Sequence, residues 1–306
     1  MMPVLSAILP IVVILVLGKI VASRQILTEE GWRGLESVTY FVLFPALIIN
    51  KLAVADFTNV DWRMPGALIG AQLVMAILSV ALGKGLRYSG ERLGVLVQSG
   101  VRWNTFIALA IAQNLMGPTG LALVAVAAAA MIPTANGLSI LALAGFSNSS
   151  MNVGSLLRQV FLNPLIVACA IGLGLNQSGL GLPQIAFDVF DILSQATIAI
   201  GLLATGAHIR LNGHNMSVGT IIGWSVFRLL GLPLVAGAFA LALSVPPSIL
   251  LVILIATAVP TASNGAILAR QLNGDVQLAA NLIAFQTIFA LASVAAILRF
   301  AEMFNP

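Results

Sequence analysis

An apolar segment at residues 247–270 is interrupted in its middle by residues that disfavour a continuous helix. These residues are a proline, three small polar residues and a glycine: Pro260, Thr261, Ser263, Asn264 and Gly265. Proline removes a backbone donor and clashes with the preceding turn, so the helix should break here. In hydrocarbon such a break is tolerated only inside protein or beside a water-filled cavity. The pattern is typical of a transporter substrate site, and a proline kink without a ligand is the simpler alternative.

The rest of the chain has the composition of a helical integral membrane protein. Of its 306 residues, 59% are hydrophobic and only 8% are charged, whereas soluble domains are about 25% charged. The net charge of +4 comes from few residues. It therefore indicates basic cytoplasmic loops rather than a nucleic-acid partner. No positive charge precedes the first apolar segment, so we expect that segment to stay in the membrane rather than to be cleaved as a signal peptide.

About ten apolar segments approach the ~20 residues that a helix needs to cross a bilayer. The expected spans are 4–21, 36–54, 65–84, 95–115, 119–144, 159–176, 185–207, 217–242, 247–270 and 276–299. Lys and Arg are concentrated in the odd-numbered loops, which places those loops in the cytoplasm. Both termini are then expected on the non-cytoplasmic side.

The two halves of the chain share a pattern. Pro10 and Gly18 have the same spacing as Pro164 and Gly172. Five segments per half is an odd number, so the halves must be inverted relative to each other, as in many secondary transporters. We expect an all-α membrane fold with a first five-helix repeat at 1–146, a central cytoplasmic loop at 147–157 and an inverted second repeat at 158–306.

The repeat places Asn104, in the fourth segment, opposite Thr261 and within about a residue of Pro260. An asparagine side chain can hydrogen-bond a loosened backbone, so a second break that crosses the first is expected there. The fourth segment lacks a proline at this point, and an interhelical polar contact is the alternative for Asn104. The candidate substrate-binding residues are Asn104, Thr105, Pro260, Thr261, Ser263 and Asn264.

Four of the charged residues within the apolar segments are candidates for a role in transport. Arg102 and Arg228 are deep in the fourth and eighth segments, where a guanidinium costs at least ~2.5–3.5 kcal/mol, so each should face a cavity or a partner. Either could support a bound anion electrostatically, but a structural ion pair or a snorkelling side chain is favoured for each. Asp188 and Asp191 in the seventh segment are candidate coupling residues, although a wet outer vestibule or a pairing with arginine is the simpler interpretation.

The sequence shows no zincin, nucleophile-elbow or phosphate-loop motif and no cysteine cluster. We therefore expect no enzymatic activity, no cofactor and no metal site.

Several stretches resemble the auxin efflux carrier family, whose bacterial members are often called malonate or malate permeases and whose plant members are the PIN-type auxin carriers. The most specific stretches lie at 40–47, 102–105, 163–172, 228–233 and 258–261. The family's crossover asparagine corresponds to Asn104 and its ninth-helix proline to Pro260. Trp103 stands where plant carriers have a proline, and their long central loop is missing here. Both departures argue against auxin itself as substrate.

The resemblance implies ten helices in two inverted repeats. Helices one, two, six and seven would form a scaffold, often dimeric, and the other six a transport domain that moves like an elevator. Substrate would bind where the fourth and ninth helices cross at their breaks. The resemblance also points to a bacterial inner membrane.

The expected function is secondary transport of a small organic anion, such as malonate, malate or an auxin-like acid. Half-helix N-termini, with roughly +0.5 charge each, suit a carboxylate. An interior-negative potential favours anion export by ~2.3 kcal/mol per charge per 100 mV, so efflux needs no coupling ion. A sodium- or proton-coupled symporter resembling bile-acid carriers is the first alternative. A membrane sensor that does not transport is the second.

Overall fold

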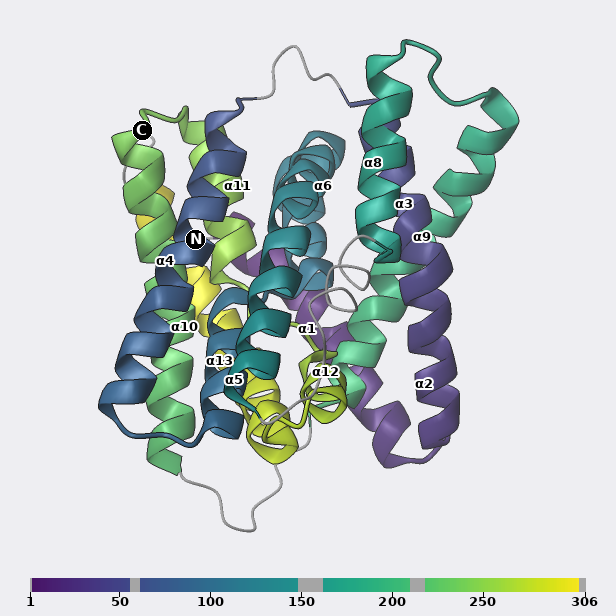
Figure 1. The fold of residues 1–306 in the computed structure, drawn as a ribbon. Coiled ribbons are helices and arrows are strands. Elements are labelled where there is room, and N and C mark those ends of the chain that lie inside the picture. The colour runs from purple at the N-terminus through teal and green to yellow at the C-terminus, as the bar shows by residue number, and fades with distance from the viewer. Residues whose placement is uncertain (1, 56–60, 148–161, 210–217, 303–306) are drawn as a thin grey trace.

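The computed structural model describes residues 2–55, 61–147, 162–209 and 218–302, and their regular structure is entirely helical (Figure 1). The helices of the first half are α1 (Met2–Ser23), α2 (Glu29–Val38), the π-helix η1 (Thr39–Leu43), α3 (Phe44–Ala53), α4 (Arg63–Gly85), α5 (Gly90–Val101) and α6 (Thr105–Phe146). Those of the second half are α8 (Pro164–Gln177), α9 (Gln184–Ala207), α10 (Val218–Ala242), α11 (Pro247–Ala258), α12 (Gly265–Gln271) and α13 (Val276–Glu302).

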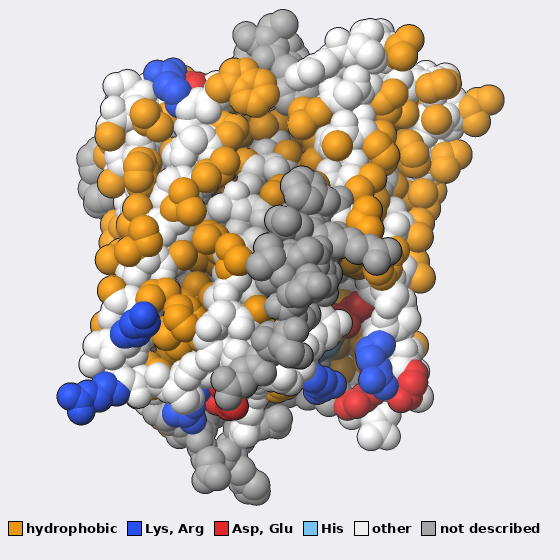
Figure 2. Space-filling view, viewed as in Figure 1, with side chains coloured by type: hydrophobic (Ala, Val, Ile, Leu, Met, Phe, Trp, Pro, Cys, Tyr) orange, Lys and Arg blue, Asp and Glu red, His pale blue; other side chains and the backbone are white. Residues whose placement is uncertain are grey.

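Length and hydropathy identify this chain as a multi-pass membrane protein. Within the described residues, seven helical stretches are long and apolar enough to cross a bilayer, and α8 and α11 are shorter apolar helices. Figure 2 shows hydrophobic side chains over the middle height of one face, with charged side chains along its lower edge and at its upper left. This banding is what a bilayer with a hydrocarbon core ~30 Å thick requires.

The expected segments and the observed helices differ mainly at their ends. The second segment was expected from residue 36, but its helix begins at Glu29. Thr28 caps this helix, because its Oγ1 accepts a hydrogen bond from the Gly31 amide at 3.1 Å, and carboxylates in the first turn suit the helix dipole. The expected start of the sixth segment at 159, and the central loop from residue 148 onward, lie outside the described residues.

A sharp turn divides α6 into two arms, residues 105–116 and 118–146. Gly117 has φ 62° and ψ −149°, a backbone conformation that is essentially confined to glycine. Pro118 then starts the second arm, since its fixed φ suits a first helical turn. The expected boundary between the fourth and fifth segments, at 115–119, falls at this turn.

The described helices pack in two groups. In one, α1 packs on α9, and α3 packs on both α8 and α9. In the other, α4, α5, α10, α11 and α13 contact one another, and α12 packs on α13. Helix α6 packs on α5 and α4, and also reaches α1, α3, α8 and α9. In Figure 1, α2, α3, α8 and α9 stand on the right, and α4, α10 and α11 on the left.

The two glycines singled out by the repeat pattern both lie at close helix crossings. A Cβ atom at Gly18 of α1 would overlap the backbone of Leu203 in α9, and one at Gly172 of α8 would lie 2.8 Å from the Cβ of Leu52 in α3. Small residues allow the backbones of membrane helices to approach closely. Helix α1 therefore packs closely on α9 at Gly18, and α8 packs closely on α3 at Gly172.

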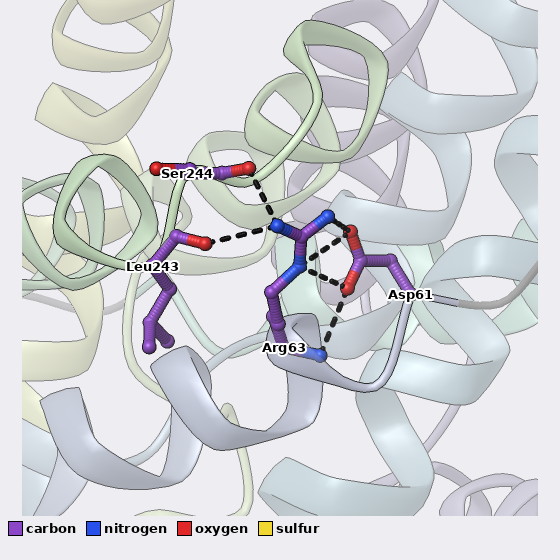
Figure 3. Close-up of polar contacts among 4 residues, drawn as sticks. All are labelled: Asp61, Arg63, Leu243 and Ser244. Carbon is purple, nitrogen blue, oxygen red and sulfur yellow. Dashed lines mark hydrogen bonds and ion pairs between the residues drawn. The ribbon is translucent and has the colours of Figure 1, made fainter.

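An arginine ties the start of α4 to the end of α10 (Figure 3). The Arg63 guanidinium donates to both carboxylate oxygens of Asp61 and to the carbonyls of Leu243 (3.0 Å) and Ser244 (2.8 Å). These hydrogen bonds from Arg63 lower the pKa of Asp61, so its carboxylate stays ionised at neutral pH. The otherwise unpaired carbonyls after α10 are satisfied at the same time.

Candidate functional site

Two helix interruptions meet inside the molecule. One separates α5, which ends at Val101, from α6, which begins at Thr105. The other separates α11 from α12, over residues 259–264. The two are joined directly, because the backbone amide of Asn104 donates to the carbonyl of Pro260 at 2.8 Å. The structure thus brings together the asparagine and the proline that the sequence pattern paired.

Asn104 supports the break in the fourth segment without a proline. Its Oδ1 accepts from the amide of Ile107 at 3.2 Å and so caps α6, which is a favoured role for asparagine. Its Nδ2 donates to Oγ1 of Thr205 in α9 at 3.2 Å. One side chain therefore starts the helix and also contacts the other helix group.

Two further backbone groups at the breaks find partners on neighbouring helices. Nε2 of Gln72 in α4 donates to the carbonyl of Val101 at 3.0 Å, and the amide of Thr261 donates to Oε1 of Gln286 in α13 at 3.1 Å. A buried backbone group left without a partner would cost free energy comparable to a lost hydrogen bond. These contacts explain how both breaks are tolerated within the membrane.

A cavity of about 940 Å³ lies between the two helix groups and contains both breaks on its wall. On the side of the breaks it is lined by Arg102, Trp103, Asn104, Thr105, Ser263 and Asn264. The facing side is formed by α2, η1, α3, α8 and α9, and includes Glu36, Tyr40 and Phe44. This volume falls within the range of small-molecule sites, ~300–1,000 Å³.

Of the six candidate substrate-binding residues, Asn104, Thr105, Ser263 and Asn264 line this cavity, whereas Pro260 and Thr261 do not. Pro260 is buried behind it. The Thr261 side chain is 2% exposed, and its hydroxyl has no hydrogen-bond partner in the described part of the chain. Pro260 and Thr261 therefore shape the site through their backbone.

The two buried arginines differ in position. Arg102 lines the cavity, is 8% exposed, and donates from Nη2 to Oδ1 of Asn264 at 2.8 Å. Arg228 is fully buried outside the cavity and donates to backbone carbonyls of the two breaks. Among the described residues, neither forms an ion pair with a carboxylate. The structural ion pair that was favoured for each arginine is therefore not seen within the described residues.

Asp188 and Asp191 lie away from the cavity. Asp191 pairs with Nζ of Lys51 in α3 at 3.2 Å rather than with an arginine. Asp188 accepts from Nε2 of Gln184 at 2.8 Å. Within the described residues, no three His, Cys, Asp or Glu side chains are grouped closely enough to hold a metal ion.

Sequence reasoning missed an acidic residue on the cavity wall. Glu36 lies 3.3 Å from Nδ1 of His208, measured from its Oε1, at the end of α9. A helical spacing could have found it, because Arg33, Glu36, Tyr40 and Phe44 recur every three or four residues and all line the cavity. Such spacing places side chains on one helix face.

Two comparisons with known proteins show what the chain is similar to. Residues 3–298 match the family model described as membrane transport protein. An uncharacterized transporter of Methanothermobacter thermautotrophicus is 27% identical to this chain over 302 residues, covering 94% of this chain and 95% of the relative. The match spans both helix breaks and the cavity between the helix groups. The chain therefore belongs to the membrane transport protein family, that of the auxin efflux carriers.

Proposed function

We propose that this membrane transporter carries small organic anions, mono- or dicarboxylates, through the cavity at the crossed breaks. The observation that carries the proposal is Arg102. Its guanidinium lines the cavity, is almost fully buried, and within the described residues has an amide oxygen rather than a carboxylate as partner. A charge in such a position needs an anion close by, and a guanidinium binds a carboxylate with two parallel hydrogen bonds.

The remaining wall suits a carboxylate as well. Asn104, Thr105, Ser263 and Asn264 provide amide and hydroxyl groups on the same side as Arg102. The N-terminus of α6 starts at this wall, and the positive end of its dipole favours an anion. Tyr40 and Phe44 supply aromatic surface on the facing wall, which fits the carbon skeleton of an organic acid.

The packing supports two inverted five-helix repeats and an elevator movement. Equivalent glycines, Gly18 and Gly172, place the first helix of each half on a helix of the other half. We infer that α1, α2, α3, α8 and α9 form the scaffold. The helices that carry the breaks would then form the moving domain. Its movement past the scaffold would carry the substrate site across the membrane.

The direction of transport and the orientation of the protein in the membrane are inferred from charge. Arg33 and Gln271, near two loops assigned to the cytoplasm, line the cavity, so this conformation would be open to the cytoplasm. An interior-negative potential then drives an anion outward. We therefore propose efflux from a cell whose inner membrane holds the protein, with both termini outside and a homodimer formed through the scaffold.

Proton-coupled symport is the second candidate, and the Glu36–His208 pair favours it. A carboxylate and an imidazole lie 3.3 Å apart beside the substrate cavity, and these are side-chain types from which proton relays in transporters are built. This candidate predicts that a pH gradient alone drives anion accumulation, whereas potential-driven efflux predicts that it does not.

Flux in proteoliposomes tests the proposal. A thermal-stability screen against organic acids first selects a ligand, since binding to the folded state raises apparent stability. Efflux of that acid under an imposed potential should then fall about tenfold or more in Arg102→Gln, because one charged hydrogen bond is worth about that factor. Arg102→Lys should retain part of the flux, and Arg87→Gln, at an exposed loop position, should retain all of it. Unchanged flux in Arg102→Gln would contradict the proposal.

A further inference from the structure

The position of Arg228 in α10 is unusual for a charged side chain. It is 0% exposed, and within the described residues its hydrogen-bond partners are backbone carbonyls. Nη1 donates to the carbonyl of Thr257 at 2.7 Å, while Nη2 and Nε donate to that of Arg102 at 2.9 and 3.2 Å. No ion pair within the described residues offsets its charge. A buried cation of this kind requires compensation from some other source.

That source is the pair of helix ends that Arg228 contacts. Arg102 is the residue at the C-terminal cap of α5, and Thr257 lies in the last turn of α11. Each helix C-terminus carries roughly −0.5 charge. Two such ends facing one point inside a membrane amount to about one negative charge, which one guanidinium balances.

The other half of the chain shows that the hydrogen bond alone does not require an arginine. Gln72 in α4 donates to the carbonyl of Val101, in the last turn of α5. Gln72 and Arg228 are 156 residues apart in sequence, as are Val101 and Thr257 (72 to 228, and 101 to 257). At these equivalent positions, the neutral amide of Gln72 donates to the C-terminal end of α5, whereas the guanidinium of Arg228 donates to the C-terminal end of α11. Arg228 also donates to the C-terminal cap of α5.

We propose that Arg228 is a built-in counter-cation that neutralises both half-helix C-termini and clamps the two breaks into a single unit. It occupies the place that a bound inorganic cation would otherwise have to fill. Because Arg228 holds the carbonyl of Arg102, it also positions the Arg102 side chain in the cavity. Arg228 is thus a positioning residue for anion binding, and this last step rests on the proposed function.

Three substitutions separate charge from hydrogen bonding. Arg228→Lys keeps the charge, Arg228→Gln keeps a donor without charge, as Gln72 does, and Arg228→Ala leaves a space of guanidinium size. We expect anion flux to fall about tenfold or more in the Gln and Ala variants, and to fall less in the Lys variant. Ser225→Ala is the matched control, because Ser225 is also buried on α10 and its hydroxyl has no partner in the described part of the chain.

Chemical rescue makes the test independent of transport. Arg228→Ala is solubilised and reconstituted with methylguanidinium chloride or with methylurea, its neutral counterpart of similar shape. Methylguanidinium should raise the melting temperature of Arg228→Ala towards that of the unmodified protein and restore flux, whereas methylurea should do neither. Neither additive should change the melting temperature of Ser225→Ala. If methylguanidinium stabilises the Ala variant but no form of the protein transports an organic anion, the counter-cation role of Arg228 is supported and the proposed function is contradicted.

Other outcomes overturn the inference. These are full flux in Arg228→Gln, equal rescue by the two additives, or a strict requirement of the unmodified protein for sodium. If Arg228→Ala cannot be purified with either additive, the Arg228→Lys and Arg228→Gln variants test the counter-cation role instead. A folded, active Arg228→Lys beside an inactive Arg228→Gln supports the counter-cation, and equal behaviour of the two contradicts it.

Discussion

At the scale of single residues, Asn104 does two things that substitutions can separate. Its Oδ1 caps α6 through the amide of Ile107, and its Nδ2 bonds to Thr205 on the other helix group. Asn104→Ala should lower the free energy of unfolding by about 1 kcal/mol, the usual cost of a lost N-cap. It should also lower anion flux. Thermal melts in detergent measure the change in stability, and proteoliposomes measure the change in flux.

Two further variants assign these effects. Serine is about as good an N-cap as asparagine, so Asn104→Ser should recover most of the lost stability. Thr205→Val leaves the cap intact and removes the hydroxyl that Asn104 contacts, so it should alter transport rate more than stability. If Asn104→Ser is as unstable as Asn104→Ala, capping is not the main contribution of this side chain.

At the scale of helices, one of the two breaks could be predicted from its local residues alone. Pro260 interrupts its helix by its own chemistry. The break at 102–104 depends instead on a cap from Asn104 and on donors that come from distant parts of the chain, Gln72 and Arg228. A local pattern does not show such partners, so the absence of a proline counted against a break that the structure contains.

Charged residues in the membrane show the same limit. Their position within the apolar segments could be predicted from the sequence, but their hydrogen-bond partners could not. Burial predicted that Arg228 needs a partner, and carboxylates were the expected ones, whereas the structure uses helix-end carbonyls. Glu36 was overlooked because it is the first residue of the expected second segment, whereas the helix begins seven residues earlier and Glu36 lies within it, on a face that lines the cavity.

The contact between α8 and α3 gives a prediction at this scale with an internal control. A methyl group at Gly172 would lie 2.8 Å from the Cβ of Leu52, whereas one at Gly174 would meet nothing within 4 Å. Gly172→Ala should therefore destabilise the protein by about 1–3 kcal/mol, the usual cost of overpacking. Gly174→Ala should leave stability unchanged or raise it slightly, because alanine favours the helix. Equal melting temperatures for the two variants would show that this crossing is loosely packed.

At the scale of the whole molecule, an elevator requires that contacts between the helix groups break while contacts within each group persist. Nδ2 of Asn114 in α6 donates to the carbonyl of Ala7 in α1 at 2.8 Å, and this contact joins the groups. Lys51 and Asp191 form a contact within one group, between α3 and α9. In a Cys169→Ala background, Hg²⁺ bridging of Ala7→Cys with Asn114→Cys should stop anion flux, and added thiol should restore it.

The same treatment of Lys51→Cys with Asp191→Cys should leave most of the flux, because these two residues would move together. Arrest by both bridges would mean that the scaffold helices must also rearrange, and arrest by neither would mean that α1 and α6 travel as one body. The outcome depends on which contacts persist through the transport cycle. It therefore tests the division into scaffold and moving domain, and any one transported acid is enough for the assay.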